Sequence, residues 1–322
     1  MADRHQIPVV VSASTRPRPE LLDHIGADTT VVLDQATWHG VGAGQRSARG
    51  GVVVTEPDVH HRSPGCSCCA VREDLVDAFV RATQRLARPE RIVVLVDPIA
   101  QDVITVVSTL LSSVEIARRC ELDAVVADLD AVELATQLAT TGDVLGSPGE
   151  GAAASLVETV AIADRIVLRR RSHVTSERRD ELSRALRIRS GFGRLDADTA
   201  VLAQHLDAWH GAPLATEQTA TSPSSPCTAI LRVATPLDPD AIDTWLEQLI
   251  TRHARRLLRV QGALSVAGQD ERTCLRGVRS FASSHSEREH PTHRSTESLL
   301  AISGIGLDVD ELAASFQATA AS

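Results

Sequence analysis

The sequence lacks several residue types, and each absence excludes a kind of chemistry. The chain of 322 residues contains no lysine, no asparagine and no tyrosine, so all 33 residues of the Lys+Arg class are arginine. Any mechanism that needs a lysine ammonium is therefore closed to this protein. Aromatic residues make up 2% of the chain, which leaves little support for stacking on the bases of single-stranded RNA.

Long apolar runs and a dense cysteine framework are also missing. No apolar run approaches the length of a membrane span, and the start MADRHQIPVVV lacks the layout of a signal peptide, so we expect no membrane partner. Six cysteines in so long a chain do not make a disulfide scaffold, which favours a reducing, cytoplasmic location. The net charge of −9 argues against general nucleic-acid binding.

Three of the cysteines are concentrated in the stretch GCSCCAVREDL, where Cys66, Cys68 and Cys69 fall within four residues. A turn can point side chains at positions i, i+2 and i+3 toward one centre, and thiolates bind zinc and copper(I). The pattern predicts a metal site, with zinc preferred to copper(I). A redox pair and simple burial of small side chains are the alternatives.

A tetrahedral zinc site needs one ligand beyond these three thiols. His60 and His61 lie a short loop upstream, and either imidazole is a candidate for the fourth position; two solvated loop histidines are an equal alternative. Cys120 is an outside candidate, for which a buried thiol is the preferred interpretation. Cys227 and Cys274 are assigned to packing.

The residues that follow the thiols show a helical pattern. Apolar side chains recur on one face at Val71, Leu75, Ala78, Phe79, Ala82 and Leu86. The spacing predicts a helix over 70–87 whose packed face holds the thiol turn in place.

The first two-thirds of the chain alternates apolar runs with helical patterns. We predict strands at 8–13, 30–34, 51–55, 91–97, 122–128 and 165–169, and helices at 20–25, 70–87, 102–119, 131–139, 152–163 and 176–187. This alternation predicts an α/β fold with a layered, mostly parallel sheet, whose ligands gather at the carboxyl ends of the strands.

The polar stretch at 216–226 (TEQTATSPSSP) is typical of a linker, dividing the chain into domains at 1–215 and 227–322. In the second domain we predict strands at 229–233, 257–266, 273–278 and 298–303, and helices at 239–249 and 308–318. Asp238 and Asp308 each precede a helix as N-cap. The pattern predicts a small α+β domain with two helices on one face of an antiparallel sheet.

Two further polar clusters are candidates for binding. His285, His290 and His293 with Glu287 and Glu289 could hold a transient metal, but a solvent loop is the preferred interpretation. Arg169, Arg170, Arg171, Arg178 and Arg179 could meet RNA phosphate or an acidic partner, with a solvated face as the commoner explanation. We find no nucleophile elbow and no paired carboxylates that indicate catalysis.

The thiol turn and its acidic helix start resemble the Cys-x-Cys-Cys element of the CobW family of zinc metallochaperone GTPases. The order of segments agrees: an apolar strand ends at Asp128, AIADRIVL at 161–168 resembles the strand that enters the guanine-recognition motif, and Gly304 to Asp308 resembles the late turn of the family's C-terminal domain. The resemblance implies a P-loop-NTPase-like first domain and a CobW C-terminal-like second domain.

The sequence departs from that family at three nucleotide motifs. The segment after the first strand, Ser12 to Pro19, has no glycine, and its two prolines lack the N–H donors that a phosphate loop needs. The guanine-reading motif is replaced by RRRSH at 169–173, and the strand that should end in Glu-Thr-x-Gly ends in LVDP at 95–98. We therefore expect no GTP binding and no enzyme activity.

The retained thiols and lost nucleotide motifs are similar to a P-loop-less CobW-like branch linked to bacterial zinc limitation. The resemblance implies a non-hydrolysing zinc-binding protein, acting as a metal-dependent chaperone or regulator in zinc homeostasis, with a metal ion and a protein client as partners. One alternative is an adaptor that recruits a ribosome-associated partner, such as hibernation machinery, under zinc limitation. The other is a working GTP-dependent zinc metallochaperone.

Overall fold

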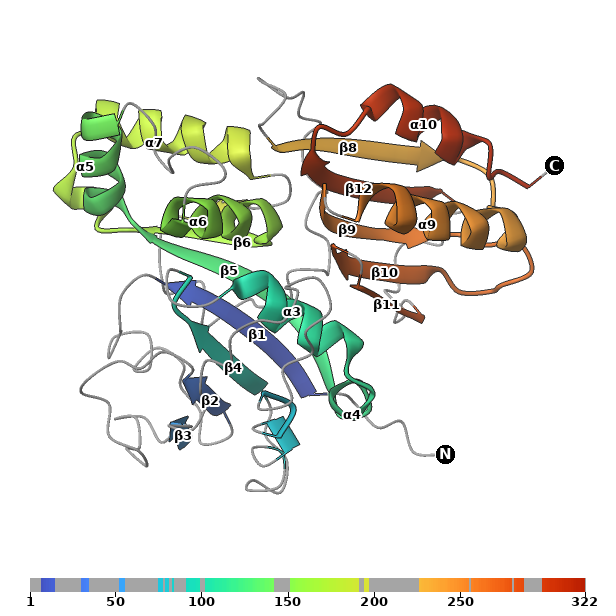
Figure 1. Ribbon diagram of the computed structural model, residues 1–322, viewed down its shortest axis with the longest axis horizontal. Coiled ribbons are helices and arrows are strands. Elements are labelled where there is room, and N and C mark those ends of the chain that lie inside the picture. The colour runs from blue at the N-terminus through green and yellow to red at the C-terminus, as the bar shows by residue number, and fades with distance from the viewer. Residues whose placement is uncertain are drawn as a thin grey trace. The chain divides into compact units, whose positions relative to one another are not determined.

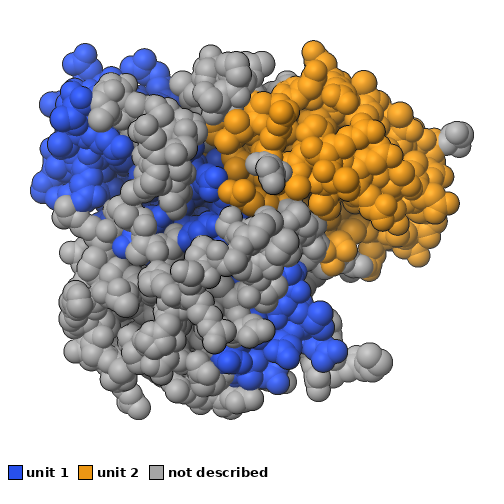
Figure 2. Space-filling view, viewed as in Figure 1, with its two compact units in different colours: residues 1–187, 193–213 blue, residues 188–192, 214–322 orange. Residues whose placement is uncertain are grey.

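The computed structural model describes residues 7–14, 30–34, 52–55, 75–77, 79–80, 83, 91–98, 102–141, 151–190, 194–196, 226–254, 256–279, 281–286 and 297–321. The chain divides into two compact units, residues 1–187 with 193–213 and residues 188–192 with 214–322 (Figure 2). Among the described helices, none has both the length and the apolar character that crossing a bilayer requires.

The described residues of the first unit form a parallel sheet of seven strands. These are β1 (Ile7–Ser14), β2 (Thr30–Asp34), β3 (Val52–Thr55), β4 (Arg91–Val96), β5 (Cys120–Asp130), β6 (Arg165–Arg169) and β7 (Arg194–Asp196). They lie in the order β3-β2-β4-β1-β5-β6-β7, and every neighbouring pair is parallel (Figure 1). The apolar central strands β1, β4 and β5 are largely buried, as expected for a sheet covered on both faces. The predicted α/β fold is confirmed.

The helices of this unit connect the strands. Those described after β4 are α3 (Val103–Ser112), α4 (Val114–Ala117), α5 (Ala131–Thr141), α6 (Gly151–Ile162), the 3-10 turn η1 (Arg171–His173) and α7 (Ser176–Arg189). Leucines and valines of α5, α6 and α7 form one core with β5 and β6. The predicted helix at 20–25 lies outside the described residues.

One predicted helix, over 102–119, is divided in the structure. Ser113 has an extended backbone (ψ 115) that ends α3, and its Oγ accepts a hydrogen bond from the N–H of Ile116 at 3.3 Å, which caps α4. The apolar periodicity continues across the break, so the pattern alone predicts one helix. A serine that satisfies the free N–H groups of a new helix decides the boundary.

In the part of the second unit that the structure describes, the sheet is antiparallel and has five strands. These are β8 (Pro226–Val233), β9 (Leu257–Leu264), β10 (Thr273–Val278), β11 (Phe281–Ser286) and β12 (Ser298–Ile305), in the order β11-β10-β9-β12-β8. The helices α9 (Pro239–His253) and α10 (Val309–Gln317) pack on the face that carries Cys227, Ala229, Leu231 and Val233 (Figure 1). The prediction of two helices on one face is confirmed.

Both helices of this sheet begin as the sequence predicts. The side chain of Asp238 accepts a hydrogen bond from the N–H of Ala241 at 2.9 Å, and that of Asp308 accepts one from Glu311 at 3.0 Å. Each aspartate therefore caps its helix.

The solvent loop predicted around His285 is wrong at its start, because His285 lies in β11. This strand pairs with β10 from Phe281 to Ser286. Its sequence FASSHS has one large apolar residue, so its strand signal is weak and the pairing with β10 decides the structure. The other members of that cluster, His290, His293, Glu287 and Glu289, lie outside the described residues.

Candidate functional site at the carboxyl edge of the parallel sheet

The candidate site lies where β1, β5 and β6 end. In the register of the sheet Ser14 pairs with Asp128, and Asp130 pairs with Arg169. Parallel strands place their carboxyl ends at one edge, so these polar residues are brought together although they are distant in sequence. The two carboxylates are deeply buried, since Asp128 is 0% and Asp130 is 2% exposed.

Arg169 joins the three strands at this edge. Its Nε donates a hydrogen bond to Oδ1 of Asp128 at 2.9 Å, and its Nη2 donates to Oγ of Ser14 at 3.4 Å. The side chain of Arg169 is 14% exposed. One guanidinium from β6 thus neutralises a buried carboxylate on β5 and reaches the last residue of β1.

Arg170 makes a second ion pair at the same edge. Its Nε and Nη2 lie 2.6 and 2.5 Å from Oδ2 of Asp130. The other oxygen of Asp130 accepts hydrogen bonds from the N–H groups of Val132 at 2.9 Å and Glu133 at 3.4 Å, so the same carboxylate caps α5. Arg170 has a left-handed backbone (φ 49), which turns the chain from β6 into η1.

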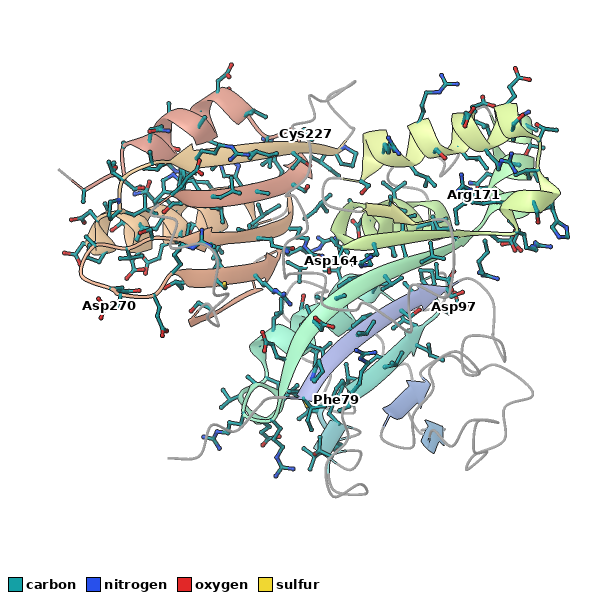
Figure 3. All side chains as sticks on the ribbon, turned by 180° about the vertical axis from the view of Figure 1, so that it is seen from behind. Phe79, Asp97, Asp164, Arg171, Cys227 and Asp270 are labelled. Carbon is teal, nitrogen blue, oxygen red and sulfur yellow. The ribbon has the colours of Figure 1, made fainter. Side chains whose placement is uncertain are left out.

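The arginine cluster predicted from the sequence is therefore largely neutralised within the chain. Arg178 pairs with Glu181 at 2.6 Å, and Nη1 of Arg179 donates to the carbonyl oxygen of Arg171 at 3.3 Å. Three of the five arginines have carboxylate partners. Figure 3 shows Arg171 at the turn after β6 and Asp97 at the end of β4.

The predicted metal ligands Cys66, Cys68, Cys69, His60 and His61 lie outside the described residues. The helix predicted to follow the thiols is described at 75–77, 79–80 and 83. There Leu75 and Phe79 are buried, as the spacing predicts, and Nη1 of Arg119 donates to Oγ1 of Thr83 at 3.1 Å. The described part of this helix is thus packed into the domain.

The other three cysteines, Cys120, Cys227 and Cys274, are buried in the fold. Burial raises the pKa of the Cys120 thiol to about 12, and it also raises the pKa of Cys227. Cys120 begins β5, at the opposite end of that strand from Asp130, which favours the interpretation of a packed thiol over a ligand. Within the described part of the chain, no three His, Cys, Asp or Glu side chains are grouped to hold a metal.

Sequence reasoning missed the ion pairs that define this edge. The resemblance pointed to the turn at 169–173, but the partners of its arginines lie 41 and 40 residues upstream. The strand register supplies the missing information. Because it pairs Asp130 with Arg169, it brings the end of β6 beside the end of β5, where both aspartates lie.

The fold defines a class of protein in which a P-loop-NTPase-like α/β domain is followed by an antiparallel domain. Residues 43–191 match the family model for the CobW/HypB/UreG nucleotide-binding domain, and residues 227–320 match that for the cobalamin synthesis protein cobW C-terminal domain. The chain belongs to the CobW family.

Comparison with solved structures gives the same fold. The Zn(II)-bound YjiA GTPase from E. coli is 19% identical with a TM-score of 0.66, over 98% of this chain and 100% of that chain. A Zn(II)-bound triple mutant of YjiA GTPase is 18% identical with a TM-score of 0.64, over the same shares of 98% and 100%. A comparison with curated protein sequences found no match.

Proposed function

We propose that this chain is a cytoplasmic, CobW-like zinc-binding protein that does not hydrolyse GTP and acts as a metal-dependent chaperone or regulator in zinc homeostasis. The observation that carries the proposal is the bridge that Arg169 makes to Asp128 and Ser14. Arg169 is the last residue of β6, where the segment that replaces the guanine-recognition motif begins. Its guanidinium reaches Ser14, at the end of the strand that a phosphate loop would follow.

The electrostatics of this edge support the absence of nucleotide binding. A phosphate site needs donors that are not already engaged, such as loop N–H groups or a lysine. Here Arg169 and Arg170 are engaged by Asp128 and Asp130. The first family match begins at residue 43, so it does not include β1 or the segment after it.

The donor chemistry of the thiol motif supports zinc as the metal. Cys66, Cys68 and Cys69 supply three thiolates, and His60 or His61 is the candidate fourth ligand. The motif lies inside the stretch that matches the family model, and the similar YjiA structures are Zn(II)-bound. Because binding requires deprotonated thiols, metal affinity would depend on pH. Because the unfolded segment has no preformed site, metal binding would also couple to the folding of the segment.

The metal part of the proposal is tested by titrating metal-stripped protein with zinc. We expect one tight site, which is lost when Cys66→Ser, Cys68→Ser and Cys69→Ser are combined. Cys274→Ser is the matched control, since that thiol is buried in β10 and should leave the stoichiometry unchanged. Zinc binding that persists undiminished in the triple variant would overturn the assignment.

A second candidate function is an adaptor that recruits a partner under zinc limitation. The observation that favours it is the exposed turn after β6, where Ser172 and His173 face solvent at the place of the guanine motif. A protein or ribosome-associated partner would then be retained differently with and without a zinc chelator. Pull-downs that recover the same set of proteins under both conditions would count against the adaptor.

A further inference from the structure

The carboxyl edge of the parallel sheet has the charge pattern of a cation site. Three oxygen-bearing side chains, Ser14, Asp128 and Asp130, are buried there at the ends of β1 and β5. Carboxylates spaced along an edge match the planar fork of a guanidinium, which donates several parallel hydrogen bonds. The negative charge of the two carboxylates repels a phosphate.

The two arginines at this edge differ in how far they are removed from water. The Arg169 side chain is 14% exposed and its partner Asp128 is 0% exposed, whereas the Arg170 side chain is 38% exposed. Charge-assisted hydrogen bonds strengthen as solvent is excluded. The ion pair of Arg169 and Asp128 should therefore contribute more than that of Arg170 and Asp130 to holding the strand ends in place.

We propose that this edge is a guanidinium site filled in cis by Arg169, which orders the ends of β1, β5 and β6 without a nucleotide. The inference rests on the proposed function, because it gives the lost nucleotide site a replacement occupant. The ligand class is a guanidinium cation, supplied by the chain itself. Its removal leaves a site that a small guanidinium from solution can refill.

The test compares Arg169→Ala with Arg178→Ala in the full-length protein. Removing Arg169 takes the counter-charge from a buried carboxylate, and the midpoint of thermal unfolding should fall by roughly 6 to 20 °C. Arg178 is the matched control: it also forms a short pair with a carboxylate, but both side chains are about a third or more exposed, so a shift of at most about 2 to 4 °C is expected.

Chemical rescue identifies the site. Millimolar methylguanidinium should restore a large part of the loss in Arg169→Ala, while methylammonium or NaCl at the same ionic strength should not. Equal midpoints for Arg169→Ala and Arg178→Ala, or recovery by NaCl alone, would overturn the proposal.

A second comparison decides the matter if Arg169→Ala does not fold. The double variant Arg169→Met with Asp128→Leu replaces the pair by apolar side chains, a change that buried ion pairs often tolerate. It should be more stable than Arg169→Met alone, and a double variant no more stable than the single one would overturn the proposal. Binding of a GTP analogue by the wild-type chain would contradict the proposed function, while these variants still decide whether the guanidinium site exists.

Discussion

At the scale of single residues, the chemistry of the carboxyl edge depends on how far each charge is removed from solvent. Arg169 and Arg170 are adjacent in sequence, and each meets a buried aspartate. Only Arg169 is itself largely withdrawn from water, so removing Arg169 should destabilise the fold more than removing Arg170. Asp130 has an additional duty, because it also caps α5.

This double role of Asp130 gives a graded prediction. Asp130→Ala removes the cap of α5 and should lower the free energy of unfolding by about 1 to 2 kcal/mol. Asp130→Asn keeps an acceptor for the N–H groups of Val132 and Glu133 and should lose less. Arg170→Ala leaves the cap intact, and the N–H groups of Val132 and Glu133 still stabilise the Asp130 carboxylate, so this variant should cost less than Asp130→Ala. Chemical denaturation of the three variants gives the order, and a reversed order would contradict the role of the cap.

The buried thiols predict a distinct reactivity. Because burial raises the pKa of Cys120 to about 12, its thiol stays protonated in the folded protein at neutral and mildly alkaline pH. In metal-free native protein a thiol reagent should label Cys66, Cys68 and Cys69 first, and Cys120, Cys227 and Cys274 only on unfolding. Rapid labelling of Cys120 in the native state, located by mass spectrometry, would contradict its burial.

The same shift fixes the sign of a pH effect on stability. The folded-state pKa of Cys120 is raised above its ordinary value of 9.0, so the folded state holds the proton more tightly than the unfolded chain. The contribution of Cys120 is fully present below pH 9 and declines as the pH rises toward about 12. Wild type should therefore lose more stability than Cys120→Ala between pH 8 and 10, measured by urea unfolding, and parallel curves would contradict it.

At the scale of elements, β9 and β12 approach one another closely at Gly262. A Cβ on Gly262 would lie 2.2 Å from the carbonyl oxygen of Leu299 and 2.8 Å from the Cα of Leu300. Both are backbone atoms held in the sheet, so they cannot move aside without separating the strands. A glycine at this position is required by space rather than by backbone angle.

Gly262→Ala should consequently destabilise the second unit by about 3 kcal/mol or more, since overpacking against backbone cannot be relieved by a side-chain rotation. Gly268→Ala is the control: Gly268 has φ +80, but nothing lies within 4 Å of its added Cβ, so about 1 to 2 kcal/mol is expected from the backbone alone. Equal losses in denaturant unfolding would contradict the close approach of the strands.

The elements also indicate how far the sequence could predict this fold. Strands such as β1 and β4 and the caps at Asp238 and Asp308 were predictable, because apolar runs and capping aspartates are local signals. The short β7, the serine-rich β11 and the break at Ser113 were not, because pairing and capping contacts decide them. The ion pairs of Arg169 and Arg170 were beyond reach, since they join side chains about forty residues apart.

At the scale of the whole molecule, the antiparallel unit has a hydrophobic core of its own. Side chains of α9, α10 and the sheet form one buried cluster, in which the ring centroids of Trp245 and Phe316 are 5.1 Å apart. A unit with such a core can fold alone. We propose that the segment 216–226 links it to the preceding domain.

Limited proteolysis should cut the native chain within 216–226, and the fragment 226–322 should unfold cooperatively. Trp245 is the single tryptophan of that fragment and is buried, so its emission should shift to longer wavelength on denaturation. A fragment without a cooperative transition would contradict the proposed domain division.

The central proposal is that a CobW-family chain has closed its nucleotide site with its own arginines while keeping its thiol motif. Titration of the zinc-loaded wild-type protein with a fluorescent GTP analogue and Mg²⁺ tests it most directly, with the YjiA GTPase as positive control. We predict no saturable signal at micromolar concentrations. Saturable binding that unlabelled GTP displaces would contradict the account.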